Sequence, residues 1–217
     1  MEIFIDTGSV RDITGLTETN LLNGVTTNPT LIAMSGRDFI NEISDICSLV
    51  DGPVSAEVTA NDTEGMITEG MRLSEIAPNV VVKLPITMAG LKACNHFSKH
   101  KIKTNLTLCF TEVQALMAAK AGATYVSPFI GRLDDVGIAG SNLITGIRKI
   151  FDNYNMETKI LAASIRTVNH VKEVAIAGAD IATMPRTVFD SLLRHPLTTV
   201  GLMQFEIDWK NTGQSIL

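Results

Sequence analysis

Short runs of β-branched and other apolar residues recur along the chain, and each is followed by an amphipathic segment of helix length. This alternation is typical of parallel strands joined by crossover helices. The number and spacing of the runs predict an α/β fold, a (β/α)8 barrel of the TIM type. The eight predicted strands are Ile3 to Asp6, Val25 to Asn28, Val54 to Val58, Val80 to Lys83, Lys103 to Leu108, Thr124 to Ser127, Lys159 to Ser164 and Asp180 to Thr183.

Two of the predicted units resemble each other, which favours a barrel over an open doubly wound sheet. Residues 119–128 and 175–185 both end a helix near a glycine, continue into a strand and close on a proline. An open sheet would more often carry a Gly-rich first turn, which is absent here. We predict one barrel domain over residues 1–217, because no linker or composition shift divides the chain.

An additional C-terminal helix is predicted at residues 197–212, beyond the eight units. Leu202, Phe205 and Trp209 follow one another at helical spacing and form an apolar stripe. Such a stripe more commonly packs on its own domain. The alternative is packing on a neighbouring subunit, and a monomer in solution would count against that.

Composition narrows the class of partner. The net charge of −5 and the lack of any Lys/Arg run argue against nucleic acid and against a membrane surface, so we expect a small-molecule substrate. No apolar stretch approaches the length of a membrane span, and Met1 leads directly into the first strand without a basic leader, which predicts a cytoplasmic protein. Cys47, Cys94 and Cys109 have no spacing that suggests a disulfide framework or a zinc site.

The most informative stretch is the fourth strand, which carries Lys83 at its end, before Pro85. Burial disfavours the charged form of a lysine, and a neutral amine is a nucleophile. Lys83 is therefore a candidate for a Schiff base with a carbonyl substrate. The alternatives are that its side chain reaches solvent from an edge strand, or pairs with a carboxylate of the core.

Polar residues gather at the carboxyl ends of the predicted strands, where barrels place their active sites. Side chains alternate along a strand, so residues two apart from an inward residue also point inward. With Lys83 taken as inward, this alternation groups it with Val81 and selects pairs on six other strands. These pairs are Phe4 with Asp6, Thr26 with Asn28, Ser55 with Glu57, Asn105 with Thr107, Ser127 with Phe129, and Ser164 with Arg166.

Asp6 and Glu57 are the two carboxylates among these inner strand ends. Schiff-base chemistry needs one group to protonate and expel a hydroxyl, and another to take a proton when a carbon–carbon bond breaks. The alternative for each is a structural salt bridge to Lys83 or Arg132. Arg132, Ser164 and Arg166 together suit a phosphate monoester, although Arg132 also has Asp134 and Asp135 close by as ion-pair partners.

Two other features of the sequence do not indicate a functional site. His96 and His100 lie four apart on a predicted helix, but no third ligand accompanies them, so no metal is expected. Tyr125 shares the inward alternation but is assigned to the core.

Several motifs in the order of the chain resemble the transaldolase family, in the short-chain branch shared with fructose-6-phosphate aldolase. The resemblance runs in register from Met1 to the C-terminal helix. Its motifs are Phe4-Ile5-Asp6-Thr7, residues 24–30 (GVTTNPT), Val82-Lys83-Leu84-Pro85, Asn105-Leu106-Thr107-Leu108 and residues 125–135 (YVSPFIGRLDD).

The resemblance implies a cofactor-free enzyme that moves a dihydroxyacetone unit between ketose and aldose phosphates. Lys83 would form the Schiff base, Asp6 would act at carbon–carbon cleavage, and Glu57 with Thr107 would work through a catalytic water. Thr26, Asn28, Asn105, Ser127 and Phe129 would bind the substrate, and Arg132, Ser164 and Arg166 its phosphate. It also implies a homo-oligomer, a pentamer or decamer, in which the terminal helix packs on a neighbour.

Two positions favour transfer over free aldol cleavage. In the aldolase branch a glutamine stands in place of Glu57 and a tyrosine in place of Phe129. A glutamate can pass a proton through water, whereas a glutamine cannot. The expected function is transaldolase of the pentose phosphate pathway. The alternatives are a fructose-6-phosphate aldolase that releases dihydroxyacetone, and a non-catalytic barrel that binds sugar phosphates.

Overall fold

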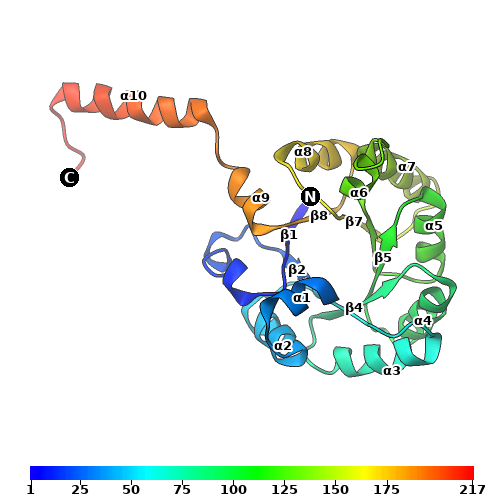
Figure 1. The fold of residues 1–217 in the computed structure, drawn as a ribbon. Helices are drawn as coiled ribbons and strands as arrows, with labels where there is room; N and C mark the ends of the chain where they lie inside the picture. Colours follow the sequence, from blue (N-terminus) through cyan, green and yellow to red (C-terminus); the bar gives the residue numbers. More distant parts are fainter.

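The computed structural model describes residues 1–217, and its eight strands close into a parallel barrel surrounded by helices (Figure 1). Each strand pairs with the next along the chain, and β8 closes the barrel against β1. The strands are β1 (Glu2–Asp6), β2 (Gly24–Thr26), β3 (Val54–Glu57), β4 (Val80–Pro85), β5 (Thr104–Cys109), β6 (Tyr125–Pro128), β7 (Lys159–Ala162) and β8 (Ile181–Met184).

All eight predicted strands are confirmed, and their bounds differ by two residues at most. The predicted seventh strand is too long, because β7 ends at Ala162. Ser164, the last residue of the prediction, has a φ of 61° and cannot continue an extended strand.

The helices lie outside the barrel, and several begin at a side chain that caps their free amides. Asn28, Asp38, Asp62, Thr87 and Thr111 each accept a hydrogen bond from the backbone N–H three residues later. The helices are α1 (Pro29–Ser35), α2 (Phe39–Leu49), α3 (Thr63–Ser74), α4 (Met88–Lys99), α5 (Glu112–Lys120), α6 (Ile130–Asp134), α7 (Gly140–Asn153), α8 (Val168–Ala177), α9 (Arg186–Ser191) and α10 (Pro196–Thr212), with 3-10 turns η1 (Val10–Asp12) and η2 (Thr17–Thr19) between β1 and β2.

The core has two layers, and the inner one supports the site. The outer layer lies between strands and helices. The inner layer fills the barrel with Phe4, Val81, Tyr125, Leu161 and Ile181, which come from β1, β4, β6, β7 and β8. The residue two positions later on each of these strands therefore lies one layer nearer the carboxyl ends.

The C-terminal helix α10 projects away from the barrel (Figure 1). None of its residues is buried, and the stripe residues Leu202, Phe205 and Trp209 are 63%, 71% and 44% exposed. The more common arrangement, in which such a stripe packs on its own barrel, is therefore absent, and packing on a neighbouring subunit stays a prediction. No helix in the chain combines the length and the apolar character that crossing a membrane requires.

Candidate active site

Lys83 lies inside the barrel, and only 4% of the residue is exposed. Its Nζ is 3.0 Å from Oε2 of Glu57 and donates to the Thr27 carbonyl at 2.9 Å. Glu57 and Lys83 face each other in the register of β3 and β4, so the parallel pairing itself brings the two groups together. The alternative in which Lys83 reaches bulk solvent is wrong, whereas the alternative in which it pairs with a carboxylate is present as a contact with Glu57.

Asp6 ends β1, opposite Thr26 in the register with β2. The Thr26 hydroxyl donates to Oδ1 of Asp6 at 2.7 Å. Burial raises the pKa of Asp6 above its ordinary value, and the Lys83 charge and the Thr26 hydrogen bond oppose this only in part. Asp6 is thus a carboxyl group whose proton affinity is increased, which suits a proton carrier.

Two adjoining cavities open where the strands end. The inner cavity, about 120 Å³, is lined by Asp6, Thr26, Asn28, Lys83, Thr107, Ser127, Phe129, Arg132, Ala163, Ser164 and Thr183. The outer cavity, about 350 Å³, shares Asp6, Asn28, Lys83, Thr107, Phe129 and Arg132 with it and adds Glu57. The amine and both carboxylates therefore face the outer cavity together, and its size suits a small metabolite.

Polar side chains on the floor of the cavity orient one another. Ser127 donates to Oδ1 of Asn105 at 2.8 Å, and Nδ2 of Asn105 donates to Ser55 at 3.2 Å. Asn105 therefore lies behind Ser127 and fixes its hydroxyl, rather than lining the cavity itself. The Thr107 hydroxyl is buried without a hydrogen-bond partner, which leaves it available to a substrate or a water molecule.

Asn28 has two roles at the cavity wall. Its Oδ1 accepts from the Leu31 N–H at 3.0 Å and caps α1, so the side-chain amide is fixed while its NH₂ group remains available to a ligand.

The structure brings together only some of the residues that were predicted to bind a phosphate. Arg132 lines both cavities and its guanidinium lies 4.9 Å from the centre of the Phe129 ring. Ser164 lines the inner cavity, but its positive φ places it there rather than strand alternation. Gly131 packs so closely on the Ser164 backbone that a Cβ would lie 2.2 Å from the carbonyl oxygen.

Arg166 lies outside these cavities. It forms a bidentate ion pair with Asp135 and lines a separate surface pocket. The ion pair that we considered for Arg132 is absent, since Asp135 pairs with Arg166 and Asp134 with His170.

Thr183 is a site residue that our sequence reasoning missed. It lines the inner cavity, and its hydroxyl oxygen is 2.6 Å from that of Thr26. The alternation along β8 would have found it, because Ile181, two residues earlier, belongs to the inner core layer.

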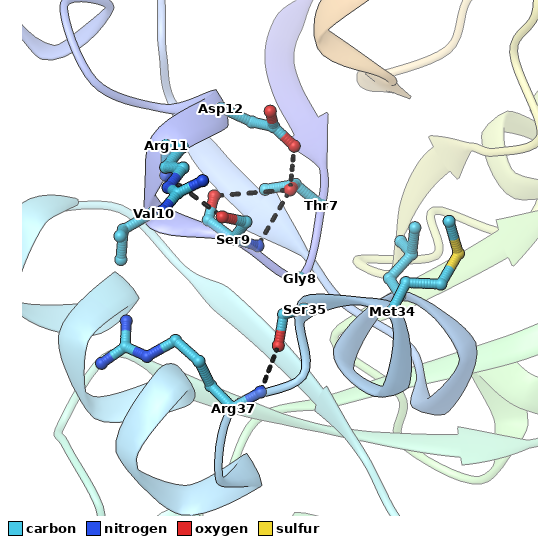
Figure 2. A pocket seen from close by; sticks show the side chains of 10 residues that line it. Thr7, Gly8, Ser9, Val10, Arg11, Asp12, Met34, Ser35 and Arg37 are labelled. Carbon is cyan, nitrogen blue, oxygen red and sulfur yellow. Dashed lines mark hydrogen bonds between the residues drawn. The ribbon is translucent and has the colours of Figure 1, made fainter.

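A separate cleft of about 570 Å³ lies between the segment after β1 and the C-terminal end of α1 (Figure 2). Its walls carry Thr7, Ser9, Arg11 and Arg37, and it contains none of the predicted site residues. It is larger than either cavity at Lys83, but no lysine that could form a Schiff base lines it.

Tyr125 and the His96–His100 pair lie away from the cavities at Lys83. Tyr125 belongs to the inner core layer, as expected. The rings of His96 and His100 lie 4.3 Å apart, and no group of three or more His, Cys, Asp or Glu residues has an arrangement that could hold a metal ion.

Comparison with known proteins adds independent information. The family described as "Transaldolase/Fructose-6-phosphate aldolase" matches residues 3–216. A "Probable transaldolase" of Caulobacter vibrioides (strain NA1000 / CB15N) is 59% identical over 217 residues, and one of Bartonella quintana (strain Toulouse) is 56% identical over 216, each covering 100% of both chains. A solved carboxyl transferase domain of Rhizobium etli pyruvate carboxylase, with 3-bromopyruvate, superimposes with a TM-score of 0.63 over 84% of this chain and 39% of its own. At 12% identity this last similarity concerns the fold alone.

Proposed function

Because the chain belongs to the transaldolase/fructose-6-phosphate aldolase family, we propose that it is a transaldolase acting through a Schiff base on Lys83. The donor would be sedoheptulose 7-phosphate or fructose 6-phosphate, and the acceptor glyceraldehyde 3-phosphate or erythrose 4-phosphate. The observation that carries this proposal is the buried Lys83 amine, 3.0 Å from Glu57 and in one cavity with Asp6.

The proposed reaction begins when the Lys83 amine attacks the C2 carbonyl of the ketose. Glu57, beside Nζ, supplies the proton with which the carbinolamine hydroxyl leaves as water, and an iminium remains. Asp6 then takes the proton of the C4 hydroxyl as the C3–C4 bond breaks, which releases an aldose and leaves an enamine on Lys83. The enamine attacks the acceptor aldehyde, Asp6 returns its proton, and hydrolysis of the new iminium frees the product ketose.

The phosphate would lie at the Arg132 end of the cavity. Arg132 and Ser164 both line it and offer a guanidinium and a hydroxyl to the phosphate oxygens. Arg166 would join them only by leaving Asp135, because the ion pair now holds its guanidinium.

Transfer is preferred over free aldol cleavage because of Glu57. A carboxylate beside the amine can pass a proton in both directions, which forming and hydrolysing the iminium both require. We further propose that the enzyme works in the pentose phosphate pathway in the cytoplasm. The alternatives, a fructose-6-phosphate aldolase and a silent sugar-phosphate-binding barrel, use the same cavity.

A trapping experiment tests the Schiff base. Borohydride added with fructose 6-phosphate should reduce the iminium to a stable adduct, which mass spectrometry of peptides would locate on Lys83. Lys83→Met should abolish trapping and transfer together, because a thioether cannot attack a carbonyl. An adduct on another residue, or full activity in Lys83→Met, would refute the mechanism.

A coupled assay separates the three functions. Fructose 6-phosphate is supplied with and without erythrose 4-phosphate, and sedoheptulose 7-phosphate and dihydroxyacetone are measured. A transaldolase forms the heptulose only when acceptor is present and releases little dihydroxyacetone. Dihydroxyacetone formed without acceptor would favour the aldolase, and calorimetric binding of the ketose phosphate without turnover would favour the silent barrel.

A further inference from the structure

Thr183 lies directly behind the Asp6–Thr26 pair, on β8. It is buried, and it follows Ile181 of the inner core layer by two residues, so its side chain points into the barrel. In the register of β8 with β1 it faces Phe4, the residue that precedes Asp6 by two.

The side-chain oxygens of Asp6, Thr26 and Thr183 form a hydrogen-bonded series. Oγ1 of Thr26 lies 2.7 Å from Oδ1 of Asp6 and 2.6 Å from Oγ1 of Thr183. A hydroxyl carries a single hydrogen, and an ionised carboxylate can only accept. When Asp6 is ionised, Thr26 must therefore donate to Asp6, and Thr183 must donate to Thr26.

We propose that Thr183 is a positioning residue for Asp6, because its hydroxyl orients the Thr26 hydrogen toward the carboxylate and stabilises the ionised form. The catalytic consequence rests on the proposed function, in which Asp6 accepts a proton at carbon–carbon cleavage. The Thr183 side chain makes no other hydrogen bond, so Thr26 is the one acceptor of its hydroxyl hydrogen. Donors in series also polarise one another, which strengthens the terminal bond.

Three other charged groups face this carboxylate across the cavities. They are Lys83 from β4, Glu57 from β3 and Arg132 from α6. Thr183 contacts none of them through a hydrogen bond or ion pair, so replacing it changes the chain of hydroxyls without removing a charge. An isosteric substitution at Thr183 therefore changes the hydrogen bonding around Asp6 and leaves the charges around it in place.

The direct test compares Thr183→Val with Thr183→Ser. Valine keeps the shape and removes the hydroxyl, whereas serine keeps the hydroxyl. The pKa of Asp6 is followed through the ¹³C resonance of its carboxyl group, assigned with Asp6→Asn. Loss of the hydroxyl that orients the Thr26 hydrogen toward the ionised carboxylate should raise this pKa by about half a unit in the valine variant. Serine should restore the wild-type value, and an unchanged pKa in the valine variant would overturn the proposal.

Kinetic measurements can separate carbon–carbon cleavage, which needs Asp6, from formation of the Schiff base, which does not. In Thr183→Val, kcat for transfer should fall about three- to tenfold and the acid limb of the pH profile should move to higher pH. Borohydride trapping of dihydroxyacetone on Lys83 should stay at the wild-type level, because that adduct forms without Asp6. Equal loss of trapping and transfer would show general damage and reject the positioning role.

The role of Thr183 and the proposed function are tested by different measurements. A wild-type protein that neither traps nor transfers would refute the transaldolase proposal, yet the titration of Asp6 would still decide the role of Thr183. Thermal unfolding of each variant checks folding. If Thr183→Val fails to fold, Thr183→Ala supplies the same loss of hydroxyl, with the same expected rise in pKa.

Discussion

Glu57 can be tested with a substitution that changes little besides its proton chemistry. Glu57→Gln keeps the shape and an acceptor near Nζ of Lys83, which lies 3.0 Å away, but cannot carry a proton. Transfer from fructose 6-phosphate to erythrose 4-phosphate should slow by about 100-fold or more. Glu64→Gln, an exposed change on α3, is the matched control and should keep wild-type kcat. A Glu57→Gln variant as fast as wild type would remove this carboxylate from the mechanism.

The alternation that grouped Asp6 and Glu57 with Lys83 also shows where prediction from the sequence is limited. The alternation predicts the direction of a side chain that belongs to a regular strand. Thr183 belongs to β8, so it could have been predicted in this way. Ser164 reaches the cavity through a positive φ after β7 has ended, which the polar pattern does not encode. The position of Arg166 depends on Asp135, a partner 31 residues away, so no local pattern could place it.

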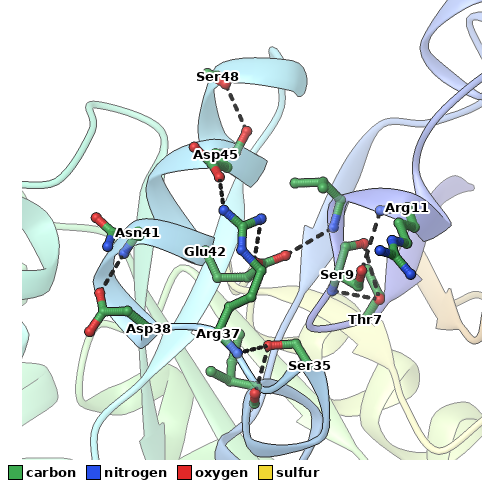
Figure 3. A network of polar contacts seen from close by, with 12 residues as sticks. Thr7, Ser9, Arg11, Ser35, Arg37, Asp38, Asn41, Glu42, Asp45 and Ser48 are labelled. Carbon is green, nitrogen blue, oxygen red and sulfur yellow. Dashed lines mark hydrogen bonds and ion pairs between the residues drawn. The ribbon is translucent and has the colours of Figure 1, made fainter.

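At the scale of elements, the segment that follows Asp6 is fastened to α2 by a fully buried carboxylate (Figure 3). Oε1 of Glu42 accepts from the Val10 N–H at 3.0 Å, and Oε2 lies 2.8 Å from Nη1 of Arg37. Arg37 also pairs with Asp45 at 2.6 Å, but that carboxylate is half-exposed. One arginine therefore has a buried and an exposed partner, which provides an internal comparison.

Glu42→Ala should destabilise the fold by about 2–4 kcal/mol, because it leaves the Val10 N–H unsatisfied and opens a cavity. Asp45→Ala should have a much smaller effect, since solvent replaces the lost partner. Urea unfolding followed by circular dichroism gives both free energies of unfolding. Equal effects of the two substitutions would show that burial does not set the strength of this contact.

For the whole molecule, the sequence was sufficient to predict the barrel because each unit repeats the same local information. An apolar run followed by a helical segment recurs along the chain, with 3-10 turns in place of an α-helix after β1, and parallel closure then follows from topology. The terminal helix has no such repetition. Its apolar stripe predicted a partner, but hydrophobic pattern alone does not say whether that partner lies in the same chain.

The exposed stripe of α10 leads to a prediction about assembly. Leu202, Phe205 and Trp209 are large and solvent-exposed, and covering the three side chains is worth about 5 kcal/mol. We propose that α10 packs on a neighbouring copy, in a pentamer or decamer. Light scattering should then give a multiple of the 23.4 kDa chain mass.

Charge placed in the stripe should break such an assembly. Phe205→Asp buries a carboxylate without a partner at the proposed contact, so the measured mass should fall toward that of one chain. Gln204→Glu adds the same charge one residue earlier on the same helix, outside the stripe, and should leave the mass unchanged. Since Asp6, Lys83 and Arg132 all come from one chain, the smaller species should still trap dihydroxyacetone with borohydride. A wild-type protein that is already monomeric at micromolar concentration would contradict the assembly while leaving the active-site proposal intact.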